Sequence, residues 1–272
     1  MKQSFSLLSA LLTLVTLLTI PSCRKFCDYI HDHPNAHDSL CRITKLTFGN
    51  TAGALQIGVT YNAKGDPTDM LELNAGKPYR ITENHFRYDG QGRLAVWLFN
   101  SSNPDPNVVP TAFAWHKYGY PQPDIINDTV ITYPPSPING PVPNAMPYAS
   151  ITVWKLDAQG RRIGVGEAVN LPNQPPPQFV ELGYDSNGNI IRIPDARVFD
   201  NAIDICRTNK VWQQITGDYN RNNLTTILPT PTNSFGLPTS LPFVVIPTSA
   251  SSPNGIVYID YACNMSKGPV KY

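Results

Sequence analysis

A short turn motif recurs along this chain of 272 residues and constrains what the chain can fold into. In each copy a strand residue is followed by Asn or Asp, two further residues and Gly. The Asn or Asp side chain accepts hydrogen bonds from the local backbone, and Gly adopts the positive φ that closes a short hairpin. Copies begin at Tyr61, Tyr88, Leu156 and Tyr184, with a weaker one at Thr232, so the predicted turn glycines are Gly65, Gly92, Gly160, Gly188 and Gly236.

The segments beside these turns have the period of two that is typical of β-strands. Before the first turn, Leu55, Ile57 and Val59 would share one face of a strand. After the second turn, residues 94–99 are apolar on both faces, which predicts a strand that is covered on both sides. Further strands are expected at 43–48, 111–120, 129–133, 151–156, 180–184, 190–193 and 255–261.

Proline is unusually frequent, with 27 residues, and it excludes long helices as the main architecture because it breaks them. The one helix that we expect is short and spans residues 209–215. We predict an all-β fold, an antiparallel meander of repeated β-hairpins that forms a strongly twisted sheet or partial barrel. Because related turns occur throughout residues 42–272, this range is expected to be a single domain.

The N-terminus has the features of a signal peptide, with Lys2 before the apolar run Leu7–Ile20. A helix of this run would span only about 21 Å, less than the roughly 30 Å of a bilayer core, so a permanent transmembrane helix is the weaker alternative. The following Pro21, Ser22 and Cys23 complete a segment that resembles a bacterial lipobox. The resemblance implies a signal peptide over residues 1–22, cleavage between Ser22 and Cys23, and acylation of Cys23.

An acylated Cys23 would anchor the protein in a lipid bilayer, because two or more acyl chains make membrane attachment stable. Arg24 and Lys25 follow, where inner-membrane lipoproteins carry Asp, so the resemblance favours the outer membrane. Whether the protein faces the periplasm or the cell surface stays open. The alternative is an ordinary secretory signal, with Cys23 as a disulfide cysteine.

The other four cysteines form an even set in an exported chain, and two disulfides are therefore expected. Four cysteines allow three pairings. We favour Cys27 with Cys41, which closes a short loop, and Cys206 with Cys263.

Three histidines lie between the first two of these cysteines, at His31, His33 and His37. Together with Cys27 and Cys41 they form a set of residue types that can bind zinc, so a metal-binding lipoprotein is one alternative. Pro34 breaks any helix that would align them, and exported thiols are readily oxidised. We therefore expect residues 23–41 to be a solvated, His-rich tether without a metal.

No segment carries a recognisable catalytic or cofactor-binding motif, and no cofactor is expected. Gly90–Ala95 fits G-x-G-x-x-A, but a strand follows it, so it is interpreted as a repeat turn. Beyond the tether, the only histidines that could act as a catalytic base are His85 and His116. His116 could pair with a distant Asp and Ser, so a glycan-processing hydrolase is kept as an alternative. Aromatic side chains on the predicted strands either form core or offer a stacking surface for a glycan, and the candidates are Trp97, Trp115, Tyr118 and Trp154.

The hairpin units resemble the YD repeats of RHS-type proteins, and still more a group of uncharacterised bacterial lipoproteins. The fuller pattern comprises Tyr88–Asp89, Trp115–Tyr118, Val211–Trp212, Asp218–Asn223 and Gly236–Thr239. The resemblance implies a family and no activity, and five units are too few to close an RHS shell.

The expected function is that of an envelope lipoprotein with a noncatalytic binding or scaffolding role. A glycan or another envelope protein is the expected partner besides the bilayer. With 21 Lys and Arg against 20 Asp and Glu, the chain has no field that would hold nucleic acid.

Overall fold

The computed structural model describes residues 41–50, 54–73, 81–102, 112–133, 148–168, 176–191, 198–225, 230–242 and 255–263. Within them, the chain is mostly β-strand, with one short 3-10 helix, η2, and one α-helix, α2. No helix among these residues is both long and apolar enough to cross a membrane. The strands of the large sheet are β1 (Cys41–Phe48), β2 (Leu55–Tyr61), β3 (Pro67–Glu72), β4 (Ile81–Tyr88), β5 (Leu94–Ser102), β6 (Ala112–Gln122), β7 (Ile125–Tyr133), β8 (Tyr148–Leu156), β9 (Arg162–Ala168), β10 (Val180–Glu181), β13 (Ser240–Leu241) and β14 (Val257–Cys263).

The twelve strands of this sheet follow the order β10-β9-β8-β7-β6-β5-β4-β3-β2-β1-β14-β13. Strands β1 to β10 are thus a meander in which each strand pairs with the next, and β14 returns to pair antiparallel with β1. The predicted antiparallel meander is confirmed. The sheet curves strongly but its edge strands β10 and β13 do not pair with each other, so it is a twisted open sheet.

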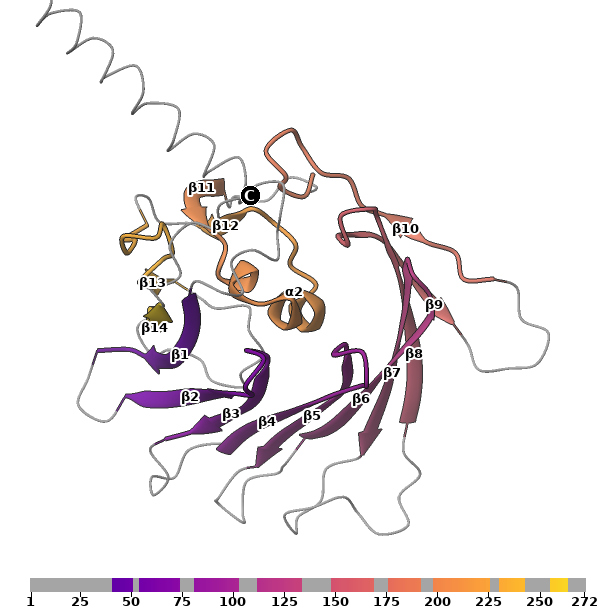
Figure 1. Cartoon of the computed structure of the whole chain (residues 1–272), viewed down its shortest axis with the longest axis horizontal. Helices are drawn as coiled ribbons and strands as arrows, with labels where there is room; N and C mark the ends of the chain where they lie inside the picture. The colour runs from indigo at the N-terminus through magenta and orange to yellow at the C-terminus, as the bar shows by residue number, and fades with distance from the viewer. Residues whose placement is uncertain are drawn as a thin grey trace, which may run out of the picture.

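The sheet forms a trough around residues 198–225, which we call the insert (Figure 1). The insert contains β11 (Val198–Ile203), η2 (Ile205–Thr208), α2 (Lys210–Thr216) and β12 (Asn222–Thr225), and β11 pairs with β12. Helix α2 matches the predicted helix with a shift of one residue. Asn209 caps it by accepting a hydrogen bond from the Val211 backbone, and Gly217 ends it at φ 67°.

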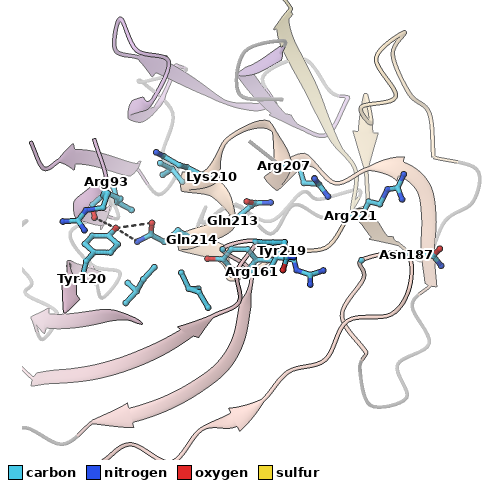
Figure 2. Close-up of a pocket in the computed structure, with 17 residues that line it drawn as sticks. Arg93, Tyr120, Arg161, Asn187, Arg207, Lys210, Gln213, Gln214, Tyr219 and Arg221 are labelled. Atoms are coloured by element: carbon cyan, nitrogen blue, oxygen red, sulfur yellow. Dashed lines mark hydrogen bonds between the residues drawn. The ribbon is translucent and has the colours of Figure 1, made fainter. Parts of the chain in front are cut away.

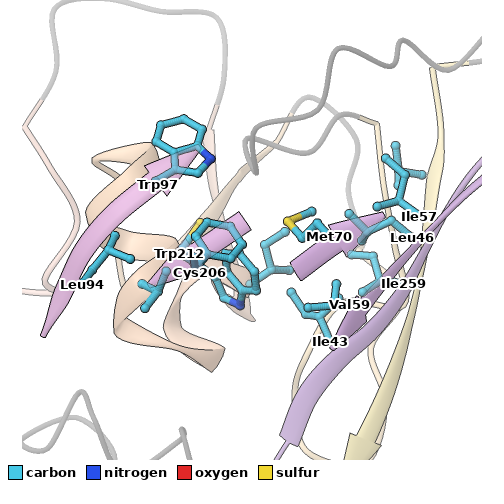
Figure 3. Close-up of a cluster of buried hydrophobic side chains, with 14 of the residues drawn as sticks. Ile43, Leu46, Ile57, Val59, Met70, Leu94, Trp97, Cys206, Trp212 and Ile259 are labelled. Atoms are coloured by element: carbon cyan, nitrogen blue, oxygen red, sulfur yellow. The ribbon is translucent and has the colours of Figure 1, made fainter. Parts of the chain in front are cut away.

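The hydrophobic core lies between the concave face of the sheet and the insert (Figure 3). Trp212 of α2 is fully buried there, and its ring meets Phe86 of β4 edge to face at 5.7 Å. The Asn209 side chain donates a hydrogen bond to the Gly65 carbonyl, which fixes the start of α2 against the first hairpin turn. Burial of large aromatic surface is the main contribution that holds the insert in the trough.

Strand β5 was predicted to be covered on both sides, but its convex face is open to solvent at Leu98. Leu98 is 37% exposed there, whereas Leu94 and Trp97 are buried on the concave face. A register shift opposite Arg87 and Tyr88 brings Leu94 and Trp97 onto the same face despite their odd spacing. The apolar residues on both faces of this strand therefore do not indicate two covering layers.

The predicted strand at 180–184 is shorter in the structure, because β10 ends at Glu181. Tyr184 instead pairs with Ile190 in an isolated bridge across a motif turn. Of the predicted strand at 190–193, residues 192 and 193 lie outside the described residues.

A disulfide joins Cys41 of β1 to Cys263 of β14. The favoured pairings, Cys27 with Cys41 and Cys206 with Cys263, are therefore wrong. The cause is the return of the chain, because β14 pairs with β1 in a register that places Cys263 directly opposite Cys41. Cys206 is a buried free thiol, and Cys27 lies outside the described residues. Cys41, the last residue of the predicted tether, is already the first residue of the sheet.

Candidate functional site

The five motif turns have the same hydrogen-bond pattern. In the second turn, the Asp89 N–H donates to the Arg93 carbonyl at 2.9 Å, and the Gly92 N–H donates to the Asp89 carbonyl at 3.0 Å. One carboxylate oxygen of Asp89 accepts from the backbone N–H groups of Gln91 and Arg93. The turn glycines all have positive φ, with values of 97° for Gly65, 78° for Gly92, 76° for Gly160, 82° for Gly188 and 76° for Gly236.

Two of these turns hold an arginine directly after the glycine. The Nε of Arg93 donates to the second carboxylate oxygen of Asp89 at 2.8 Å, and Arg161 makes the same bond to Asp157. Asp89 accepts hydrogen bonds from the backbone N–H and from the side chain of Arg93. These bonds lower the pKa of the Asp89 carboxyl, although partial desolvation raises it. The aspartate thus stays charged and orients the guanidinium.

Each of these arginines also stacks on a tyrosine of a neighbouring hairpin. The guanidinium carbon of Arg93 lies 4.2 Å from the ring centre of Tyr120, and that of Arg161 lies 4.4 Å from Tyr184. A carboxylate on one side and an aromatic face on the other leave each guanidinium little freedom.

The same tyrosines join consecutive hairpins through their hydroxyls. Tyr120 donates to the carbonyl of Leu94 at 2.7 Å, two residues after the turn glycine. Tyr88, Tyr184 and Tyr261 repeat this bond at the carbonyls of Pro67, Arg162 and Pro238, and Tyr61 donates to Ile43.

A cavity of about 620 Å³ lies between these turns and the insert (Figure 2). Its size falls in the range of about 300 to 1,000 Å³ that is usual for small-molecule sites. The sheet side contributes Arg93, Leu94, Tyr120, Ile126, Leu156, Gln159, Gly160, Arg161, Asn187 and Gly188, and the insert contributes Arg207, Lys210, Val211, Gln213, Gln214, Tyr219 and Arg221.

The charged residues in this lining are all basic. The described residues that line the cavity include four arginines and one lysine, and none is acidic. Arg93 and Arg161 have carboxylate partners, whereas the side chains of Lys210 and Arg221 form no ion pair within the described part of the chain. The lining therefore has an excess of basic side chains, although the whole chain has a net charge of only +1.

Three of the arginines, Arg161, Arg207 and Arg221, form a cluster of like charges. Burial lowers the pKa of Arg207, and the nearby positive charges of Arg221 and Arg161 lower it further. Asp204 opposes this effect, but burial and the neighbouring Asp218 raise the pKa of Asp204 and favour its neutral form. We call these three arginines the arginine cluster.

Two glutamines on α2 also line the cavity. Gln214 exchanges hydrogen bonds with the Tyr120 hydroxyl. Gln213 is only 6% exposed, and its amide has no hydrogen-bond partner within the described residues. This amide is therefore available to a ligand group that enters the cavity.

The structure does not bring the four predicted aromatic candidates onto one surface. Trp97, Tyr118 and Trp154 are buried on the concave face, whereas Trp115 is 39% exposed. The Trp97 ring stacks on His116 at 4.1 Å between ring centres. These three buried rings are part of the core and do not line the cavity.

The two histidines beyond the tether each bind a carboxylate. His116 lies 3.0 Å from Asp128, and His85 lies 2.7 Å from Asp69. No group of three potential metal ligands occurs within the described ranges. The predicted lipidation, cleavage and metal candidates Ser22, Cys23, Cys27, His31, His33 and His37 lie outside those ranges.

Of the sequence-predicted candidates, only the turn glycines Gly160 and Gly188 line the cavity. A signal exists for two other lining residues, because Arg93 and Arg161 directly follow a motif glycine. No local pattern marks Arg207 or Gln213, and Arg221 lies in the Asp218–Asn223 segment of the family-like pattern without being singled out there; all three reach the cavity because the insert folds into the trough.

No protein-family model matches the chain, and no curated protein sequence matches it. The resemblance to YD-repeat lipoproteins therefore stays a prediction.

Proposed function

We propose that this protein is a lipid-anchored component of the bacterial cell envelope with a noncatalytic binding role. Its ligand occupies the cavity between the repeat turns and the insert. The observation that carries this proposal is the cavity itself, which has the size of a small-molecule site and a lining held in place by the hairpin repeat.

The anchoring part of the proposal is supported by the sequence. Lys2, the apolar run Leu7–Ile20 and Cys23 have the order that a lipoprotein signal requires. Acylation of Cys23 would hold the β-sheet, whose first strand starts at Cys41, close to the membrane surface. The outer membrane is the proposed location.

The binding part is supported by the rigidity of the lining. Arg93 and Arg161 are oriented before any ligand arrives, by Asp89 and Asp157 and by the tyrosine rings beneath them. Preorganised groups lose little entropy on binding, which favours a binding site over an incidental gap.

Metabolic labelling tests the anchor. The full-length protein, expressed in a Gram-negative host with an alkyne analogue of palmitate, is expected to be labelled and to fractionate with the outer membrane. The Cys23→Ser variant should lose both properties. An unlabelled wild-type protein would contradict lipidation.

A thermal-shift screen tests the binding role with neutral glycans, acidic glycans, peptides and divalent metals. A ligand at 100 times its Kd stabilises the folded state by about 2.7 kcal/mol, which raises Tm by several degrees for a domain of this size. A ligand that raises the Tm of the wild-type protein, but not that of a cavity variant, would support the proposal. No shift with any class, beside a sharp unfolding transition, would contradict it.

A further inference from the structure

We propose that the cavity binds an acidic oligosaccharide, whose carboxylate or sulfate groups contact the basic side chains and whose hydroxyls contact the amides. This inference rests on the proposed binding function and names the ligand class of that same site.

The arginine cluster supplies three of the five basic side chains in the cavity lining. Arg161 comes from the β8–β9 turn, Arg207 from η2 and Arg221 from the segment before β12, so three separate elements contribute guanidinium groups to the lining of one cavity. Like charges at short range repel each other, and burial strengthens that repulsion because less water screens it. A bound anion would relieve it, and guanidinium groups match the planar oxygens of carboxylate and sulfate.

The other end of the cavity is also basic. Figure 2 shows Arg93 and Lys210 on one side of the view, and Arg207 and Arg221 on the opposite side. Lys210 is exposed at the first position of α2 and has no ion pair within the described residues. Two separated basic ends favour a ligand with more than one acidic group over a single small anion.

Polar and aliphatic side chains line the cavity between its two basic ends. Figure 2 places Gln213, Gln214 and Tyr219 there, and Gln213 has the unpartnered amide. An amide can both donate to and accept from a hydroxyl, and it therefore suits the alternating hydroxyls of a sugar. The lining also includes four aliphatic side chains, against which the C–H faces of a sugar would pack, namely Leu94, Ile126, Leu156 and Val211.

A nucleotide fits the lining less well than a saccharide. The cavity tyrosine Tyr120 already has the Arg93 guanidinium stacked over its ring. Tyr219 is buried, at 8% exposure, among the residues of the insert. Neither ring offers two open faces between which a base would be sandwiched.

Isothermal titration calorimetry of the full-length protein, extracted in a neutral detergent, tests this inference. The probes are trigalacturonate, a sulfated chondroitin disaccharide, neutral cellotriose and sodium sulfate. We expect at least one acidic saccharide to bind and cellotriose to bind at least tenfold more weakly. The tighter of the two acidic saccharides identifies the acid group.

Two variants at opposite ends locate the site. Arg221→Gln removes a charge from the arginine cluster, and Lys210→Gln removes one from the exposed start of α2. Because Arg221→Gln removes one charged hydrogen-bonding partner, it is expected to lower the affinity for the acidic saccharide by about tenfold. The matched control is Arg87→Gln, which removes an exposed arginine outside the cavity and should leave the affinity within about twofold.

Four results would overturn the inference: equal binding of cellotriose, unchanged affinity in both cavity variants, binding of sulfate without either saccharide, or no binding by any of the four probes. Its failure differs from failure of the proposed function. A neutral glycan or peptide that protects the wild-type protein and not a cavity variant would retain the binding role and reject the acidic saccharide.

Discussion

The hydroxyl of Tyr120 donates a hydrogen bond to the carbonyl oxygen of Leu94, two residues beyond the turn glycine of the preceding hairpin. Tyr88 and Tyr184 repeat this bond at 2.6 and 2.9 Å. A bond that recurs at the same position of each unit couples neighbouring hairpins at one end of the sheet. The same end carries Arg93 and Arg161, two of the four arginines that line the cavity, so the repeat both joins the hairpins and positions part of the lining.

The tyrosine hydroxyls predict a stability loss at alkaline pH. Burial, as the largest cause, raises the pKa of Tyr184 from 10.0 to about 12, and it also raises the pKa of Tyr88 and Tyr261. Because the folded pKa lies above the unfolded one, this stabilisation is present below pH 10 and is lost as pH rises toward 12.

We therefore expect cooperative unfolding in this interval. Circular dichroism should change together with tyrosinate absorbance in an alkaline titration. Full ionisation of the tyrosines near pH 10 without loss of circular dichroism would contradict the hydrogen-bonded arrangement.

The second turn offers a matched pair of glycine substitutions. Gly92 has φ 78° with open space around a new Cβ, so Gly92→Ala is expected to cost only the backbone strain, about 1 to 2 kcal/mol. Gly90 lies in the same turn without positive φ and with open space as well, so Gly90→Ala should be neutral or stabilising by up to about 1 kcal/mol. Urea unfolding measures both, and equal effects would contradict the assigned turn geometry.

The disulfide predicts a large contribution to stability. Cys41 and Cys263 are 222 residues apart, and in the chain-entropy account a loop of this length is worth about 5 kcal/mol. Cys263→Ser should lower the free energy of unfolding by several kcal/mol in urea. Reduction should lower it in the wild type and have little effect on this variant.

Peptide mapping without reduction tests the pairing directly. It is expected to yield a cross-linked peptide that contains Cys41 and Cys263, with Cys206 as a thiol. A cross-link from Cys27 to Cys41 would contradict the structure and restore the pairing that the short loop favours.

The local elements could be predicted from the sequence, whereas the cavity could not. The turns are encoded in five residues each, and the alternating apolar residues of β2 and the short helix α2 are also local signals. The pairing of β1 with β14 depends on where the chain returns after residue 242, and no local pattern encodes it. The disulfide partner of Cys41 was therefore not predictable from spacing.

The exposed face of β5 is a second feature that could not be predicted from the local sequence. A register shift changes which residues share a face, so counting by twos from Leu94 places Trp97 on the wrong side. The cavity depends on the same kind of long-range information, because Arg161 and Arg221 line one cavity only through the fold of the insert.

The cavity holds an excess of positive charge that a bound anion relieves, and the Arg221→Gln variant measures that excess. Removing one member of the arginine cluster should reduce repulsion with Arg161 and Arg207, and raise Tm by about one to three degrees at low ionic strength. Added sulfate should then raise the Tm of the wild-type protein and of the Arg87→Gln control more than that of Arg221→Gln. A lower Tm for Arg221→Gln, or the same response to sulfate in all three proteins, would contradict the account.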